Sequence, residues 1–166
     1  MTTRKFGLLA GGVLALYAIQ TSLLPLLAYR GVTADLMLLL VTSAAFLRGS
    51  RIGAFIGFCV GLMEDLASGS FLGMNAFTRL LLGYAVGSCS DRVFKDQIFL
   101  PVASSLFVTA ANYFILAVLM LLLGYRFNLA SHAQYTLLPM LVYQLVFAYP
   151  VHRIVCAANK RVGAKV

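Results

Sequence analysis

The chain has 166 residues, of which 61% are hydrophobic and only 11% are charged, and its mean hydropathy is +0.93. Soluble domains carry about 25% charged residues, so this composition excludes an ordinary water-soluble domain and indicates an integral membrane protein. A net charge of +8 would suggest nucleic-acid binding in a soluble chain. Here the basic residues stand between apolar runs, where they orient membrane helices, so we expect no nucleic-acid partner.

The apolar runs predict that residues 1–166 form a single all-α transmembrane domain, a bundle of six helices. The expected spans are residues 6–27, 35–47, 52–67, 71–88, 98–123 and 134–155. Arg4 and Lys5 precede the first run as in a signal peptide. That run is longer than the apolar part of a signal peptide, so we expect an uncleaved first span.

The second span begins with polar residues. Thr33 is a plausible N-cap, and Asp35 lies in the first turn, where the helix dipole favours an anion. A helix of this length rises only about 20 Å, whereas the hydrocarbon core of a bilayer is about 30 Å thick. The second span is therefore short for a membrane crossing unless it includes its neighbours.

The third and fourth spans carry the most informative pattern. Gly53, Gly57 and Gly61 recur four residues apart and share one helix face, at whose end Glu64 and Asp65 follow. Small residues in register let helices approach closely in lipid. We predict a face for helix packing or partner binding, although glycine is also simply common in membrane helices. The predicted set comprises Gly53, Gly57, Gly61, Gly69, Gly73, Gly83 and Gly87.

Charged residues inside these spans predict a buried ion pair. Asn75 and Arg79 lie one turn apart in the fourth span, which a short turn joins to the third. Arg79 can therefore reach back to Asp65 or Glu64, and a buried pair tolerates lipid better than a lone charge. In the alternative, Arg79 bonds to backbone carbonyls or lines a small wet cavity. The predicted buried polar set is Asp35, Glu64, Asp65, Asn75 and Arg79.

The later spans add fewer signals. The fifth span carries polar residues at near-helical spacing, which we expect to face the bundle: Ser104, Ser105, Thr109 and Asn112. Pro150 is expected to kink the end of the sixth span.

The distribution of basic residues predicts the orientation. With six spans, ten of the thirteen Lys and Arg residues fall on the side of the two termini: Arg4, Lys5, Arg48, Arg51, Arg92, Lys95, Arg153, Lys160, Arg161 and Lys165. Only Arg30 and Arg126 fall on the other side, and Arg79 lies within a span. Positive charge is enriched in cytoplasmic loops, so we predict that both termini are cytoplasmic.

Residues typical of catalysis are scattered. The three cysteines, Cys59, Cys89 and Cys156, have no metal-ligand spacing. His132 stands alone, and neither a Walker loop nor an HExxH motif occurs. We therefore predict no enzymatic activity, no catalytic residue, no metal site and no cofactor.

The motif order in residues 33–87 resembles a known family. Asp35 opens a leucine-rich run, and Gly57-Phe58, Asp65, Ser68-Gly69 and Leu72-Gly73 then follow in order. This order resembles that of the rod shape-determining protein MreD family, although Ala34 stands where that family usually has Pro.

The resemblance implies a non-enzymatic scaffold of the elongasome in the bacterial inner membrane. Such a scaffold binds MreC and links MreB filaments to the peptidoglycan synthases, RodA and its transpeptidase partner, so that the cell stays rod-shaped. The resemblance also implies an architecture similar to the S components of energy-coupling-factor transporters.

Two other functions remain open at this stage. A substrate-binding subunit of a vitamin-type transporter would use the polar residues toward the outer half of the bundle, but the short loops argue against it. A membrane enzyme acting on lipid or peptide would need a nucleophile or a metal set that the sequence does not assemble.

Overall fold

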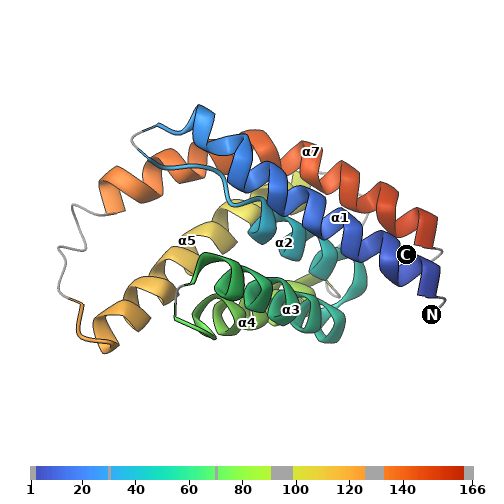
Figure 1. Ribbon diagram of the computed structural model, residues 1–166, viewed down its shortest axis with the longest axis horizontal. Helices are drawn as coiled ribbons and strands as arrows, with labels where there is room; N and C mark the ends of the chain where they lie inside the picture. Colours follow the sequence, from blue (N-terminus) through green and yellow to red (C-terminus); the bar gives the residue numbers. More distant parts are fainter. Residues whose placement is uncertain (1–2, 30, 70, 91–98, 126–132, 163–166) are drawn as a thin grey trace.

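The computed structural model describes residues 3–29, 31–69, 71–90, 99–125 and 133–162. Every regular element in these residues is a helix, so the predicted all-α class is confirmed (Figure 1). The six described α-helices are α1 (Thr3–Ser22), α2 (Leu36–Arg48), α3 (Ser50–Ser68), α4 (Met74–Ser90), α5 (Phe99–Leu122) and α7 (Leu138–Val162). A 3₁₀ turn, η1 (Leu24–Leu27), follows α1, and a π-helical turn, η2 (Ala133–Leu137), precedes α7.

Helix ends differ from the predicted spans where proline and glycine intervene. The helix α1 ends at Ser22 rather than near residue 27, because Pro25 has no N–H for a helical bond and lies in η1. The helix α4 starts at Met74 rather than at residue 71, after Gly73 at φ 101°. Pro150 lies inside α7, which continues to Val162.

The short helix α2 is the centre of the bundle. Every residue from Leu36 to Phe46 is buried, and α2 contacts α1, α3, α4, α5 and α7. Helices that are apolar on all sides are buried in this way. Because neighbouring helices surround α2, its 13 residues do not have to match the thickness of a bilayer.

The N-cap of α2 corrects the sequence-based expectation. Asp35, not Thr33, is the cap residue, and its Oδ1 accepts a hydrogen bond from the backbone N–H of Leu38 at 2.8 Å. Asp35 has a non-helical backbone conformation, and its neighbours Ala34 and Leu36 are buried. The N-terminal end of α2 therefore places a carboxylate in the interior of the bundle.

The helices α3 and α4 form an antiparallel hairpin whose backbones are in close contact. A Cβ on Gly61 would lie 2.5 Å from the carbonyl oxygen of Asn75, and one on Gly53 would lie 2.6 Å from that of Gly83. A Cβ on Gly57 would overlap the carbonyl group of Arg79. On α4, added Cβ atoms would overlap α3 in the same way, at Gly83 against Gly53 and at Gly87 against Ser50.

Gly69 and Gly73, the two other glycines of the predicted set, flank the turn between α3 and α4. Their φ angles are 63° and 101°, and a Cβ at either would meet nothing within 4 Å. Glycine adopts positive φ without steric cost. In this structure the two residues therefore shape the turn rather than form a contact between helices.

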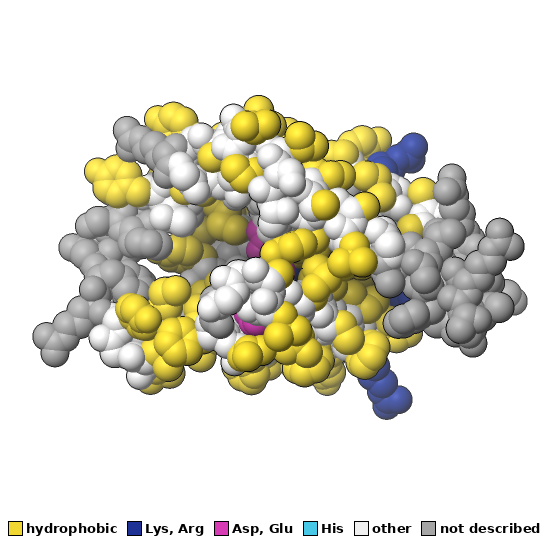
Figure 2. Space-filling model, viewed as in Figure 1, with side chains coloured by type: hydrophobic (Ala, Val, Ile, Leu, Met, Phe, Trp, Pro, Cys, Tyr) yellow, Lys and Arg dark blue, Asp and Glu magenta, His cyan; other side chains and the backbone are white. Residues whose placement is uncertain are grey.

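Apolar side chains cover much of the outer surface (Figure 2). Two helical segments are long and apolar enough to cross a membrane, Ala103–Leu122 and Tyr135–Asn159. Large side chains such as Phe107, 77% exposed, and Leu122, 79% exposed, point outward from α5. These features agree with association with a membrane.

The start of α1 and the end of α7 lie at the same end of the bundle (Figure 1). The dark blue Lys and Arg side chains that are visible in Figure 2 lie toward this end. Apart from Arg48, Arg51 and Arg153, the side chains counted for the orientation lie outside the described part of the structure, as does His132.

Candidate functional site

Arg79 joins three helices through two carboxylates. From α4, its Nη2 donates to Asp35 Oδ2 at 2.8 Å and to Asp35 Oδ1 at 3.1 Å, and it also pairs with the carboxylate of Glu64 on α3. Arg79 itself is only 2% exposed. We refer to Asp35, Glu64 and Arg79 as the charge triad.

Sequence reasoning found part of this triad. The structure has the Arg79–Glu64 pair, one of the two predicted pairings, and it adds Asp35. That third member was missed because it precedes a different helix and lies 44 residues from Arg79. An acid at the start of a leucine-rich run was the available signal, since a buried carboxylate requires a partner.

Asp65, the other predicted partner of Arg79, caps α4 instead. Its Oδ2 accepts from the backbone N–H groups of Gly73 at 2.9 Å and Ala76 at 3.1 Å. Its Oδ1 accepts from the backbone N–H of Asn75 at 3.2 Å and from the Asn75 side-chain amide at 2.9 Å. A carboxylate at a helix N-terminus binds unpaired N–H groups and the positive end of the dipole, which is why Asp65 faces α4 and not the guanidinium.

Two glutamines tie the outer helices to this centre. Gln20 of α1 donates to Glu64 Oε1 at 3.3 Å and accepts from the backbone N–H of Met37 at 3.0 Å. Gln144 of α7, which is fully buried, accepts from the backbone N–H of Asp35 at 3.1 Å and donates to its carbonyl oxygen at 3.2 Å. These bonds between distant parts of the chain could not be read from sequence spacing.

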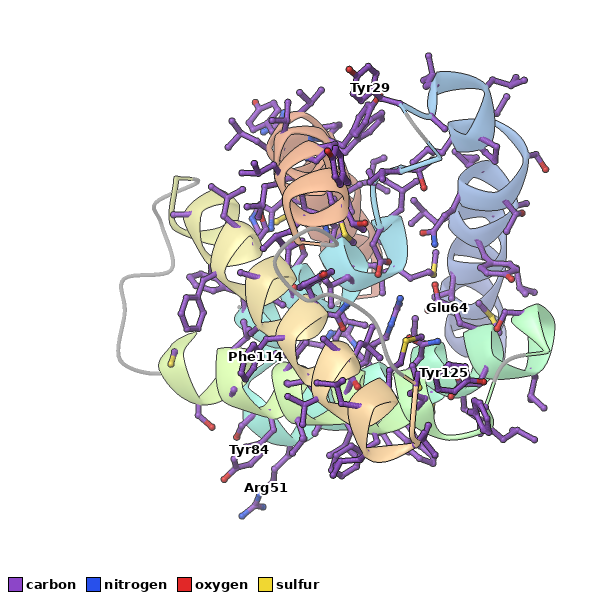
Figure 3. All side chains as sticks on the ribbon, turned by 90° about the vertical axis from the view of Figure 1, so that its left-hand side faces the viewer. Tyr29, Arg51, Glu64, Tyr84, Phe114 and Tyr125 are labelled. Carbon is purple, nitrogen blue, oxygen red and sulfur yellow. The ribbon has the colours of Figure 1, made fainter. Side chains whose placement is uncertain are left out.

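A pocket of about 320 Å³ lies beside the charge triad. Most of its lining side chains are polar or charged: Tyr17, Gln20, Thr21, Thr33, Ala34, Asp35, Glu64, Ser68, Asn75, Arg79 and Met140. Figure 2 shows acidic atoms at the edge of a hollow in the molecule, and Figure 3 shows Glu64 where α1 and α3 approach each other. Among the described residues, Arg79 Nε and Nη1 have no hydrogen-bond partner.

The polar stripe on α5 faces inward as expected. Ser105, Thr109 and Asn112 are at most 4% exposed, and the Thr109 hydroxyl donates to the carbonyl oxygen of Ser105 at 2.7 Å. Ser104 is half-buried. This stripe packs within the bundle and lies away from the pocket lining.

The cysteines do not form a metal-binding cluster in the part of the chain that the structure describes. Cys59 and Cys89 are exposed, and Cys156 Sγ lies 3.4 Å from His152 Nε2 on α7. The described residues contain no group of three or more His, Cys, Asp or Glu side chains that could hold a metal ion. The site that the structure does assemble is a polar, charged pocket held by buried hydrogen bonds.

The sequence matches the family model described as rod shape-determining protein MreD over residues 4–157. The chain belongs to the MreD family. This match extends the resemblance seen in residues 33–87 to nearly the whole chain, and it includes the charge triad and the glycines of the α3–α4 hairpin. Members of this family are membrane proteins, and membership supports a role for this chain in determining rod shape.

Comparisons with curated proteins and with solved structures give no match for this chain. The expected likeness to the S components of energy-coupling-factor transporters therefore stays a prediction.

Proposed function

We propose that this chain is a non-enzymatic scaffold of the elongasome in the bacterial inner membrane. It binds MreC and thereby links MreB filaments to RodA and its transpeptidase partner. The observation that carries the proposal is the match to the MreD family over residues 4–157. The remaining support comes from how the bundle uses its polar residues.

Buried polar groups in this chain are engaged in holding helices together. The charge triad connects α2, α3 and α4, while Gln20 and Gln144 attach α1 and α7. Hydrogen bonds between membrane helices contribute about 1 kcal/mol each. A bundle fixed at so many points keeps its outer surface in a constant shape, which suits a protein whose product is contact with partners.

The partner surface in this proposal is an outward face. The face of α3 that carries Gly53, Gly57 and Gly61 packs against α4, so MreC cannot bind to it. Exposed aromatic side chains on α3, Phe55 at 67% and Phe58 at 40%, and on α5, Phe107 at 77% and Phe114 at 62%, offer large contact areas. Aromatic side chains carry much of the binding energy of protein interfaces.

The proposal includes six membrane crossings with both termini in the cytoplasm. The excess of basic residues on the side of the termini supports this orientation. The common end of α1 and α7 supports an even number of crossings (Figure 1).

Co-purification from native membranes tests the scaffold. The tagged chain is extracted with its lipid, and MreC, RodA and MreB are quantified by mass spectrometry. We expect MreC to be the most enriched partner. Two double variants, Phe55→Ala with Phe58→Ala and Phe107→Ala with Phe114→Ala, each remove exposed aromatic side chains from one helix and leave the interior unchanged. We expect one of these double variants to reduce the amount of MreC recovered while the amount of the chain itself stays the same. Recovery of none of these proteins with the unaltered chain would contradict the proposal.

The pocket favours a second candidate, the substrate-binding subunit of a small-molecule transporter. Its volume of about 320 Å³ lies near the lower end of the range for ligand sites. Depletion of the chain separates the two functions, because loss of the scaffold rounds the cells, whereas loss of a transporter subunit lowers uptake of its substrate.

A further inference from the structure

The charge triad carries one excess negative charge. It places two carboxylates, Asp35 and Glu64, against one guanidinium, Arg79. No other described Lys, Arg or His side chain lines the pocket beside it. Asp65 is not a lining residue, and its carboxylate binds the N-terminus of α4. An uncompensated charge away from bulk water is costly, so the pocket requires one positive charge, from a proton or from a bound cation.

The two carboxylates are more accessible than the guanidinium. The side chains of Asp35 and Glu64 are 13% and 9% exposed, whereas that of Arg79 is 3% exposed and its Nε and Nη1 atoms are buried. Acidic atoms are visible at the edge of the hollow in Figure 2. A ligand in the pocket therefore meets carboxylate oxygens and does not depend on bonds from Arg79.

Three carboxylate oxygens retain acceptor capacity. Among the described residues, Asp35 Oδ2 and Glu64 Oε2 each bind only Arg79. Glu64 Oε1 binds only the Gln20 amide. A carboxylate oxygen has two lone pairs, so each of the three can accept one further hydrogen bond. Because Asp35 Oδ2 and Glu64 Oε2 both bind the same nitrogen of Arg79, they are close enough together for a second nitrogen to bind both.

The pocket is larger than a bare ion requires. Its volume is about 320 Å³, whereas an ion of the size of a water molecule needs only about 30 Å³. Outside the charge triad every lining residue is neutral. Tyr17, Ala34 and Met140 contribute apolar surface, and Thr33 and Asn75 add uncharged polar groups. The space and the apolar walls favour an organic cation over a proton or a monatomic ion.

From these observations we propose that the pocket binds a primary ammonium group at the end of an alkyl chain, with a single net positive charge. The ammonium donates to Asp35 Oδ2 and to the carboxylate of Glu64, and its charge balances the excess of the triad. The alkyl part contacts Met140 and the ring of Tyr17. This binding is separate from the scaffold role and can be tested without MreC.

Two sources carry this chemistry. One is a free alkylamine, and the other is the lysine side chain of a neighbouring membrane helix. In either source the ammonium has three N–H donors. A quaternary ammonium has the same charge and no N–H donor, and an alcohol has no charge, so the site should discriminate against both.

The test measures binding to the purified full chain in detergent at neutral pH by isothermal titration calorimetry. Butylamine, butyltrimethylammonium and butanol are compared in one arm. In a second arm, a leucine-rich model helix with one central lysine is compared with the same helix carrying norleucine there. We expect butylamine, or the lysine helix, to bind at least about tenfold more tightly than its controls, the ratio expected from one charge-assisted hydrogen bond.

Two pairs of variants locate the binding. Glu64→Gln removes the excess charge from the pocket, whereas Asp65→Asn removes an equal charge from the adjacent residue, which does not line the pocket. Met140→Trp fills the pocket without altering the charge triad, and Val142→Trp adds the same side chain to the same helix at a position that is 65% exposed. We expect Glu64→Gln and Met140→Trp to abolish the preference, and Asp65→Asn and Val142→Trp to keep it.

The outcomes are distinct. A preference for butylamine that both pocket variants abolish and both controls keep supports the site with a free amine as its source. The same pattern for the lysine helix alone supports a lysine side chain as its source. Thermal unfolding identifies any variant that fails to fold, and the other pair then decides. No preference in either arm, or a preference that no pocket variant reduces, overturns the proposal whether or not MreC co-purifies.

Discussion

At the scale of single residues, Arg79 determines how the interior charges coexist. One guanidinium on α4 binds two carboxylates, one from the start of α2 and one from α3. The desolvation of these groups costs free energy, so the triad is not a large net source of stability. Its effect is on specificity, because any arrangement of these helices that separates the guanidinium from the carboxylates leaves buried charges without partners.

Removing the guanidinium should therefore destabilise the folded chain by more free energy than the intact triad contributes to stability. We expect Arg79→Met to lower the free energy of unfolding by about 3–5 kcal/mol, because Asp35 and Glu64 would then face each other uncompensated. The measurement is denaturant unfolding in detergent micelles. Combining the change with Asp35→Asn and Glu64→Gln should restore most of the loss.

Arg51 provides the matched control for this experiment. It is exposed and points away from the bundle (Figure 3), so Arg51→Met should change stability by no more than about 0.5 kcal/mol. Equal stability of Arg79→Met and the unaltered chain would show that the triad does not hold the helices together.

Asp65 illustrates a second way to bury a carboxylate, through backbone N–H groups alone. We expect Asp65→Ala to lower the free energy of unfolding by about 1–3 kcal/mol, because the N–H groups of Gly73 and Ala76 lose their acceptor. Asp65→Asn keeps one acceptor oxygen and should lose less. Thermal unfolding of both variants gives the comparison, and a greater loss in Asp65→Asn than in Asp65→Ala would contradict the capping role.

At the scale of elements, the α3–α4 hairpin depends on direct contact between backbones. Five glycines let the two helices approach until an added methyl group would overlap the opposite chain. Close approach increases van der Waals contact, which drives helix association where the surroundings are as apolar as the side chains.

A methyl group at the centre of the hairpin should separate its helices. We expect Gly57→Ala to lower the free energy of unfolding by about 1–3 kcal/mol, because the new Cβ meets the Arg79 carbonyl group. Gly12→Ala on α1 is the matched control, since a Cβ there meets nothing within 4 Å. That change should be neutral or stabilising by up to about 1 kcal/mol, from helix propensity alone.

Unfolding in detergent distinguishes the two glycine variants. Similar effects of Gly57→Ala and Gly12→Ala would mean that the hairpin tolerates a wider separation. Because Arg79 is attached to the same stretch of backbone, we also expect Gly57→Ala to weaken the charge triad, so its effect should not be additive with that of Arg79→Met.

At the scale of the whole molecule, the bundle surrounds α2 with its other helices and turns an apolar surface outward. Charge is found in the centre, where it is paired, and at the end shared by the start of α1 and the end of α7 (Figures 1 and 2). This distribution is one that a bilayer favours, because interior charges are shielded by protein and basic residues gather at one end of the bundle, where they can meet water.

Reporter fusions test the orientation directly. A fluorescent protein fused before residue 1 or after residue 166 should fluoresce, and alkaline phosphatase inserted after Tyr125 should be active, because six crossings place that position outside the cytoplasm. Active phosphatase at either terminus would contradict the proposed topology.

The sequence alone determined the class of protein, the number of apolar runs and the glycine pattern, because these depend on composition and on spacing along one helix. Four-residue spacing places Gly53, Gly57 and Gly61 on one face whatever the fold. The pattern does not reveal whether that face meets a partner or a neighbouring helix of the same chain, and the structure places it against α4.

Only the tertiary structure determines which charged side chains form ion pairs. Arg79 is paired with Asp35 and Glu64, whereas Asp65, adjacent to Glu64, caps α4. Neighbouring residues on a helix point about 100° apart, so only the positions of α2 and α4 around α3 determine what each carboxylate reaches. The pocket has the same origin, because its lining comes from distant segments that become neighbours only when the helices pack.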